Sequence, residues 1–203
     1  MFYSVNTVFE SAIQSKEIQY SIDTNIQHKY AVCDKTKLQE IYLNIVSNAI
    51  KYTPNGQAIH VNITETASDD KKAWYVFICE DTGIGMKQEY LPHIFDEFSR
   101  EHTATENKVV GTGLGLSIVK SFVELMDGKI YVESEQGKGT KFTVEIPLEI
   151  ASEEDVYKKK ESEQSVISDK SIGKRILLAE DIQMAKKCRN ERSYCKTIGW
   201  GKK

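Results

Sequence analysis

The sequence predicts an α/β fold: a two-layer α/β sandwich in which a mixed sheet of about five to six strands packs on about three helices. Two observations lead to this prediction. Short segments in which apolar and polar residues alternate recur along the first 150 residues, as is typical of half-buried strands. Longer segments with apolar residues at helical spacing lie between them, bounded by capping or turn signals.

The first predicted elements are a helix and two strands. Helical spacing is found at Val5, Val8, Phe9, Ala12 and Ile13. Alternation at Ile18, Tyr20 and Ile22 then predicts a strand after Glu17, and residues 30–33 predict a second one. Asp34 is a good N-cap for a helix with a wide apolar stripe between Leu38 and Ile50, and Pro54-Asn55-Gly56 ends that helix.

The remaining elements complete the sheet. Alternation at residues 59–63 and an apolar run at 74–79 predict two strands joined across a polar turn at 68–72. Residues 81–113 have little periodicity and predict a long loop. A helix follows from Leu114 to Leu125 and ends before Gly128, and strands at 129–133 and 140–146 are joined by a turn at 137–139.

Composition excludes several classes of protein. With 27 Lys and Arg against 30 Asp and Glu, the net charge of -3 argues against a strongly electrostatic nucleic-acid binder. No apolar run approaches the length of a membrane span, and the first residues do not resemble a signal peptide, so we expect a cytoplasmic chain without a membrane segment. The four cysteines form no CxxC pair, and we expect Cys33 and Cys79 to be reduced core residues.

Two glycine-rich motifs point to chemistry. Asp81-Thr82-Gly83-Ile84-Gly85 follows a strand, so that a carboxylate would point into the cavity that the turn lines; an ordinary strand-end turn is the alternative. The second motif opens a helix, where exposed backbone N–H groups could hold phosphate. It comprises Gly111, Thr112, Gly113, Leu114, Gly115 and Leu116.

A third motif lies on the long central helix. Asn44 and Asn48 are four residues apart and share one helix face, and Lys51 follows one turn later. Polar side chains within so apolar a helix need a partner. Capping or helix–helix hydrogen bonds would explain one such asparagine, but they explain two asparagines and a lysine less well.

Together and in this order, the motifs resemble the ATP-binding catalytic domain of sensor histidine kinases, a member of the Bergerat-fold ATPases. The resemblance includes an asparagine box at 43–54, a first glycine box at 81–85, a phenylalanine box at 94–98, a second glycine box at 111–116 and a final Gly-Lys-Gly-Thr at 137–140. It covers about residues 1–150. It implies a histidine kinase that binds ATP and Mg²⁺ and acts in a two-component phosphorelay.

The resemblance also implies a role for each residue. Asp81 would accept a hydrogen bond from the adenine amino group, with Thr140 joining through water. Asn48 would give its carboxamide oxygen to Mg²⁺ and Asn44 would assist in placing phosphate or metal. Lys51 and Arg100 would balance phosphate charge, Tyr52 would lie beside the nucleotide, and Gly83 and Gly85 would form the adenine turn. The part of the long loop between the phenylalanine box and the second glycine box would be a lid, anchored by Phe95 and Phe98. Its glycines Gly111, Gly113 and Gly115, with Thr112, Leu114 and Leu116 beside them, would let it approach the phosphates. Lys51 and Arg100 could instead be solvated surface residues.

Asn44 favours a kinase over a hydrolase. Family members that hydrolyse ATP, and the related serine kinases, have a glutamate as general base four residues before the metal-binding asparagine, where this sequence has Asn44. An amide has no useful basicity. A neutral imidazole already has a lone pair for the γ-phosphate, so a histidine acceptor needs no strong base.

The phosphoacceptor is expected to lie on another domain. None of His28, His60, His93 and His102 precedes an acidic residue on an amphipathic helix, so the partner would be a histidine-containing dimerisation domain. A non-catalytic nucleotide-binding regulatory module is the alternative function.

The last quarter of the sequence differs in composition. Residues 151–173 are polar and predict a linker. Residues 174–203 resemble an incomplete response-regulator receiver start, in which Glu180 and Asp181 would bind Mg²⁺, and they suggest a receiver domain as a further partner. We expect the strand at 175–179 to lack partner strands and the tail to add little stability.

Overall fold

The computed structural model describes residues 7–69, 71–100, 112–152 and 175–178. Their elements are, in chain order, α2 (Glu10–Ser15), β1 (Gln19–Asn25), β2 (Tyr30–Cys33), α3 (Lys35–Tyr52), β3 (Ala58–Ser68), β4 (Lys72–Asp81), the 3₁₀ helix η1 (Leu91–His93), α4 (Gly115–Leu125), β5 (Lys129–Glu135), β6 (Gly139–Ile150) and β7 (Arg175–Leu178).

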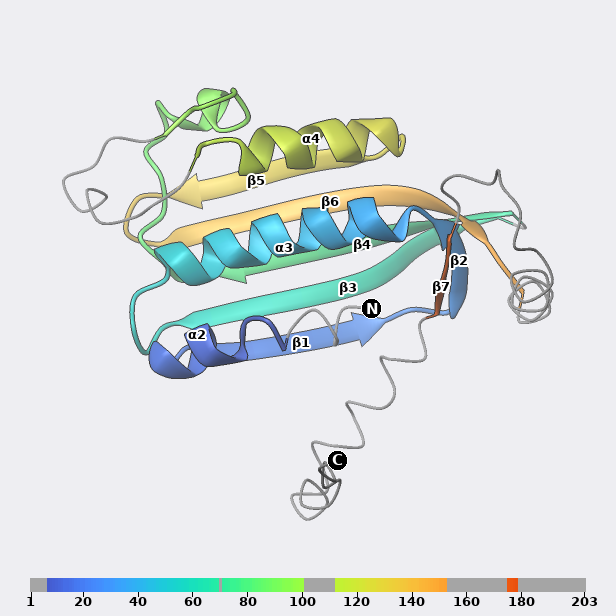
Figure 1. The fold of residues 1–203 in the computed structure, drawn as a ribbon, viewed down its shortest axis with the longest axis horizontal. Helices are drawn as coiled ribbons and strands as arrows, with labels where there is room; N and C mark the ends of the chain where they lie inside the picture. Colours follow the sequence, from blue (N-terminus) through green and yellow to red (C-terminus); the bar gives the residue numbers. More distant parts are fainter. Residues whose placement is uncertain (1–6, 70, 101–111, 153–174, 179–203) are drawn as a thin grey trace, which may run out of the picture.

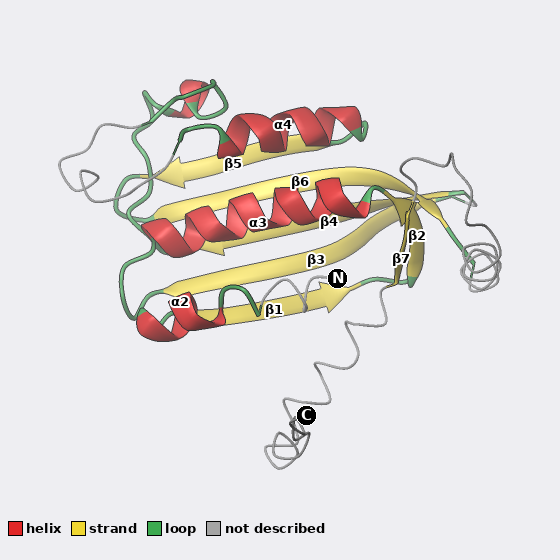
Figure 2. Cartoon of the chain, viewed as in Figure 1, coloured by secondary structure: helices red, strands yellow, loops and turns green. Residues whose placement is uncertain are grey.

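The strands form one mixed sheet, as predicted. Its order is β1-β3-β4-β6-β2-β7, and β5 also pairs with β6. β1 and β3 are parallel, whereas the other pairs are antiparallel. Figures 1 and 2 show the long helix α3 and its neighbour α4 lying over one face of the sheet, which makes the two-layer sandwich.

The core lies between α3 and the sheet. Ile45 and Val46 of α3 are fully buried, as are Ile59 and Val61 of β3. The ring of Tyr42 lies 5.3 Å from that of Phe77 on β4. The apolar stripe of the sequence therefore faces the sheet, and it holds α3 in a fixed position along the strands.

Asp34 caps the start of α3 as predicted. One of its carboxylate oxygens accepts hydrogen bonds from the backbone N–H groups of Thr36 at 3.0 Å and Lys37 at 3.1 Å. Such a cap stabilises a helix by about 1 kcal/mol. The predicted first helix is shorter than expected, since α2 starts at Glu10 and residues 1–6 lie outside the described part of the chain.

The expectation that the strand at 175–179 has no partner is wrong for its described residues. β7 pairs antiparallel with β2 over all four of its residues, so it extends the sheet at that edge. A strand at residues 175–178 does not need the other strands of a receiver domain as partners, because an open sheet edge can accept an extended segment that reaches it. Ala179, Glu180 and Asp181 lie outside the described residues.

The cysteine and histidine predictions have separate outcomes. Cys33 and Cys79 are free and buried, as expected. His28 lies just before β2, His60 lies in β3 and His93 lies in η1, whereas His102 is outside the described residues.

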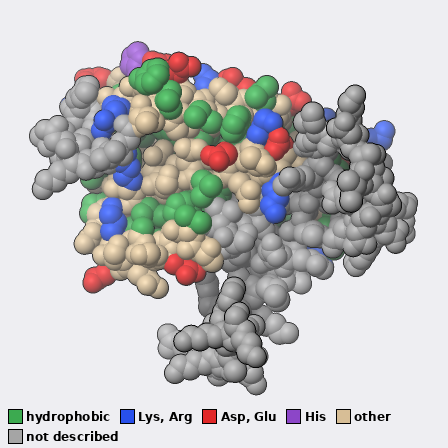
Figure 3. Space-filling view, in the orientation of Figure 1, with side chains coloured by type: hydrophobic (Ala, Val, Ile, Leu, Met, Phe, Trp, Pro, Cys, Tyr) green, Lys and Arg blue, Asp and Glu red, His purple; other side chains and the backbone are tan. Residues whose placement is uncertain are grey.

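Among the helices that the structure describes, none is long and apolar enough to cross a membrane. Acidic and basic side chains are both scattered over the face in Figure 3, in agreement with the nearly balanced charge.

Candidate functional site

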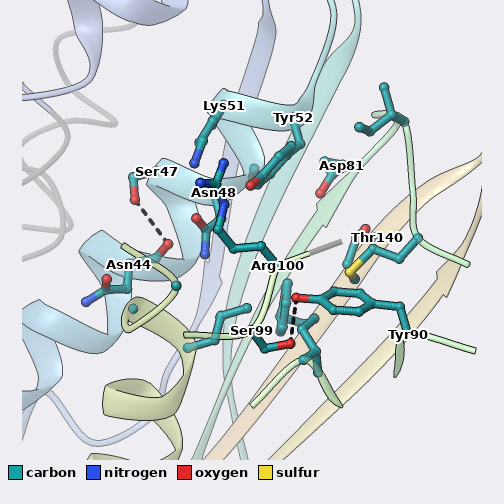
Figure 4. A pocket seen from close by; sticks show the side chains of 18 of the residues that line it. Asn44, Ser47, Asn48, Lys51, Tyr52, Asp81, Tyr90, Ser99, Arg100 and Thr140 are labelled. Carbon is teal, nitrogen blue, oxygen red and sulfur yellow. Dashed lines mark hydrogen bonds between the residues drawn. The ribbon is translucent and has the colours of Figure 1, made fainter. Parts of the chain in front are cut away.

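A cavity of about 320 Å³ opens beside the C-terminal half of α3, where β4 ends and β6 begins. This volume is within the range of about 300–1,000 Å³ that small-molecule sites occupy. Figure 4 shows side chains from α3, both strand ends and the loop around residue 100 directed toward one space. The predicted residues that line it are Asn44, Asn48, Lys51, Tyr52, Asp81, Gly85, Arg100, Thr112, Gly113, Gly115, Leu116 and Thr140.

Asp81 lies at the buried end of the cavity, and only 6% of its surface is exposed. Its Oδ1 accepts a hydrogen bond from the Gly83 N–H at 2.9 Å. Burial raises the pKa of this carboxyl to about 6, although the backbone N–H groups of Gly83 and Thr140 partly oppose that shift. The pocket therefore holds a carboxylate that ionises just below neutral pH.

Thr140 lies directly opposite Asp81 in the β4–β6 pairing. Its hydroxyl is 3.0 Å from the Ser134 hydroxyl, and Ser134 in turn donates to the Gly139 carbonyl at 2.9 Å. These contacts fix the Thr140 side chain, which lies near Asp81 in Figure 4.

The glycines around Asp81 permit backbone contacts that a side chain would block. A Cβ on Gly83 would lie 2.6 Å from the Tyr52 carbonyl oxygen. Gly139 has φ +117°, and a Cβ there would lie 1.9 Å from the Asp81 carbonyl oxygen. The backbone of the first glycine box therefore packs directly on the end of α3 and on the start of β6.

The α3 face brings its polar motif together as predicted. Asn44, Asn48 and Lys51 all line the cavity, and the Lys51 ammonium lies 4.9 Å from the centre of the Tyr52 ring. Asn44 also has a structural partner, because its Nδ2 donates to the Glu40 carbonyl at 2.8 Å. A Cβ on Gly115 would lie 2.7 Å from the Asn44 Oδ1, so this carboxamide lies where α3 meets the start of α4.

Lys16 holds the C-terminal end of α3 and was missed by the sequence analysis. Its ammonium donates to the carbonyl groups of Ile50 at 2.7 Å, Lys51 at 3.0 Å and Thr53 at 3.0 Å. These groups lie at the helix end that carries Lys51 and Tyr52, and the Tyr52 carbonyl accepts the Ile84 N–H at 3.2 Å. Burial lowers the pKa of Lys16. A lysine more than 30 residues away gives no local signal for this cap.

The predicted lid anchors differ from each other. Phe95 is half-buried and packs on the core, as an anchor should. The side chain of Phe98 is 69% exposed, so its expected anchoring role is not supported. Its backbone makes the connection instead, because the Phe98 N–H donates to the Gly113 carbonyl at 3.1 Å. Gly111 lies outside the described residues, and Gly83, Phe95, Phe98 and Leu114 do not line the cavity.

Several lining residues were not predicted. Phe142 follows Thr140 by two positions in β6 and so shares its face of the strand, which strand periodicity could have indicated. Met86 follows the first glycine box directly. The others are Ser47, Ala49, Ile84, Tyr90, Ile94 and Ser99.

Comparison with known proteins shows the family of this chain. Residues 33–150 match the family model described as histidine kinase-, DNA gyrase B- and HSP90-like ATPase. The autoinducer 2 sensor kinase/phosphatase LuxQ of Vibrio parahaemolyticus is 32% identical over 184 residues, which is 88% of this chain and 21% of LuxQ. The sensor histidine kinase WalK of Bacillus subtilis is 36% identical over 126 residues, or 62% of this chain and 20% of WalK. The chain thus spans about a fifth of each of these relatives.

Solved structures agree as well. Full-length ShkA in complex with AMPPNP is 27% identical with a TM-score of 0.58, covering 74% of this chain and 30% of ShkA. The catalytic domain of the histidine kinase ThkA is 28% identical with a TM-score of 0.56, covering 71% of this chain and 88% of that domain. The fold is therefore that of a histidine kinase catalytic domain, and the chain belongs to the histidine kinase-, DNA gyrase B- and HSP90-like ATPase family.

Proposed function

We propose that this chain is the Mg-ATP-binding catalytic domain of a two-component sensor histidine kinase, and that it transfers the γ-phosphate to a histidine on a separate dimerisation domain. The observation that carries the proposal is one cavity with the buried Asp81 carboxylate at one end and the polar face of α3 along its side. Nucleotide binding to ShkA, whose structure contains AMPPNP, supports the same use of this fold.

Asp81 is the proposed adenine-recognition residue. A buried carboxylate can accept a hydrogen bond from the amino group of adenine, whereas guanine has a carbonyl at that position and would leave both groups unpaired. The Gly83 N–H donates to the Asp81 Oδ1 at 2.9 Å and the Thr140 backbone N–H also acts on this carboxylate, whereas an ionised carboxylate has about four acceptor positions. The carboxylate therefore has acceptor capacity for a ligand.

Asn48 is the proposed protein ligand of Mg²⁺. In the described part of the chain, no group of three His, Cys, Asp or Glu side chains is placed to hold a metal. Mg²⁺ commonly binds through one or two protein oxygens together with phosphate oxygens and water, and the half-buried carboxamide of Asn48 fits that donor set. When bound, the ion would neutralise charge that develops on the phosphates.

Asn44 supports phosphoryl transfer rather than hydrolysis. Its amide group cannot take a proton from water, and the donor end of the amide is already bonded to Glu40. We therefore assign Asn44 to positioning at the junction of α3 and α4. Lys51 and Arg100, which also line the cavity, would balance the negative charge of the phosphates.

The acceptor and the regulator are proposed partners. None of the described histidines lies on an amphipathic helix, so the phosphoacceptor would belong to another domain of the parent protein or to a partner. Residues 174–203 remain a proposed receiver start. Relatives named hybrid signal transduction histidine kinases support that arrangement, including kinase D of Dictyostelium discoideum, which is 33% identical over 162 residues, or 80% of this chain and 10% of kinase D.

Phosphoryl transfer in trans tests the proposal. The chain is mixed with a histidine-containing dimerisation domain and γ-labelled ATP, and we expect label on that domain but neither self-labelling nor steady hydrolysis. Asn48→Ala, which removes the proposed oxygen ligand of Mg²⁺, should abolish the transfer. Tight ATP binding without transfer to any of several such domains would favour the regulatory module, and rapid hydrolysis that Asn48→Ala abolishes would favour an ATPase.

A further inference from the structure

The outer edge of β2 carries a strand from the far end of the described chain. β7 pairs antiparallel with β2, with Ala31 opposite Leu177 and Cys33 opposite Arg175, and Figure 1 shows the two strands together beyond β6. We propose that this edge is a strand-addition interface and that residues 175–178 of the same chain are its occupant. The proposal does not depend on nucleotide binding.

The backbone direction of β2 identifies the groups that meet β7. The Ala151 N–H donates to the Tyr30 carbonyl at 3.0 Å, so Tyr30 directs its backbone groups toward the β6 side. Residues along an antiparallel strand alternate between its two edges. Val32 therefore also faces β6, where it is opposite Glu149, whereas Ala31 and Cys33 face β7.

The same alternation applies to β7. Leu177 and Arg175, which lie opposite Ala31 and Cys33, direct their N–H groups toward β2. Ile176 directs its N–H group away from β2. Leu177 and Ile176 thus differ in the direction of their backbone N–H, and substitution by proline, which has no N–H, can test that difference.

Chain connectivity favours an occupant from the same molecule. Ala151 pairs with β2, and 22 residues, 153–174, separate Ser152 from Arg175. A segment of that length reaches about 70 Å when extended, so it easily returns to the same edge. Its effective concentration would be about millimolar, which exceeds any ordinary concentration of a second copy.

The interface has a consequence for the tail. β2 leads directly to Asp34, the N-cap of α3, so β7 adds a strand at the entry to the helix that carries the asparagines. Residues 175–178 cannot pair with β2 and at the same time form a central strand of another sheet, so this interface and the proposed receiver start are alternative states of the same segment.

Hydrogen exchange on the full chain tests the pairing. Amide exchange of Ala31 and Cys33 is measured by NMR in the wild type, in Leu177→Pro and in Ile176→Pro. Leu177→Pro removes an N–H that faces β2, whereas Ile176→Pro removes a similar side chain and an N–H that faces away, where proline is tolerated at a sheet edge. The Val32 amide, which faces β6, reports whether the domain remains folded.

We expect protection of Ala31 and Cys33 in the wild type, a loss of about tenfold or more in Leu177→Pro and a change of about twofold or less in Ile176→Pro, with Val32 unchanged in all three. Absence of protection in the wild type, or equal losses in both variants, would overturn the interface. Protection that rises with protein concentration together with dimer formation would overturn the same-chain occupant.

Discussion

The two ends of the cavity are built in different ways. At the Asp81 end, strand termini and glycine backbones meet with no space for an added Cβ, and the carboxylate is 6% exposed. Along α3 and the residue-100 loop, the half-buried or exposed side chains of Asn48, Lys51 and Arg100 line the wall. The first end is fixed by the fold, so it suits recognition of a rigid base. The second can adjust its side chains, so it suits a charged chain of phosphates.

The largest expected effect is the loss of backbone space at the Asp81 end. In Gly139→Ala the new Cβ would lie 1.9 Å from the Asp81 carbonyl oxygen at a φ of +117°, so strand β6 must shift. We expect the free energy of unfolding to fall by about 3 kcal/mol or more, measured by urea denaturation.

Gly137→Ala is the matched control in the same turn. Gly137 also has a positive φ, +83°, but nothing lies within 4 Å of a Cβ there. We expect a cost of only about 1–2 kcal/mol from the backbone conformation. Equal costs for the two variants would show that the Asp81 end is less tightly packed than the structure indicates.

The second effect concerns adenine recognition. Asp81→Asn should weaken ATP binding by more than about tenfold. The amide replaces one acceptor oxygen by an NH₂ group, so the adenine amino group would be buried without an acceptor, at a cost of about 1–3 kcal/mol. Calorimetry measures the affinity. The wild type should also discriminate against GTP, and equal affinities for ATP and GTP would contradict the assignment.

Much of the fold and of the Asp81 end of the cavity could be predicted from the sequence, because the residues that indicate them lie close together in the chain. Asp34 caps α3 through residues two and three positions away, and the glycine boxes are short motifs, so both were identifiable. Lys16 could not be predicted as a cap, since it reaches the end of α3 from 34–37 residues away. The β2–β7 pairing was missed for the same physical reason: strand partners are set by tertiary contacts.

Phe98 shows the limit of a motif. The phenylalanine box predicted two aromatic anchors, but its second aromatic is 69% exposed and has φ +61°. Its position serves the backbone hydrogen bond to Gly113, which residue type alone does not indicate. The motif indicated the segment, but it did not indicate that the backbone of Phe98, rather than its ring, makes the contact.

The pH dependence of binding gives a third test of the Asp81 end. The pKa of Asp81 is raised to about 6, so the carboxylate is mainly ionised at pH 7.5 and mainly protonated at pH 5. The ionised form is the better acceptor for the adenine amino group, so affinity should fall as the pH falls through 6, by up to about tenfold between pH 7 and 5. Adenosine is the probe because it has no phosphate that titrates, and Asp81→Asn should remove the dependence.

The same shift also affects stability, in the opposite direction. A folded-state pKa above the ordinary value of 3.8 means that protonation favours the native state, so this contribution is fully present below pH 3.8 and is lost as the pH rises through 6. Asp81→Asn should therefore melt at pH 7.5 no lower than the wild type, although it binds ATP less tightly. A lower melting temperature would indicate that the carboxylate stabilises the fold, contrary to its burial.

The smallest expected effect lies at the other end of the cavity. Lys51→Met keeps most of the aliphatic stem beside Tyr52 but removes the charge, so it should weaken ATP binding by only about threefold, because a half-exposed ion pair contributes little. The loss should shrink further at high salt, since the interaction is screened. Adenosine affinity should not change, because adenosine has no phosphates for Lys51 to meet. If Lys51→Met instead weakened adenosine and ATP equally, the lysine would support the Tyr52 wall of the pocket, and the division between a base end and a phosphate end would be wrong at this residue.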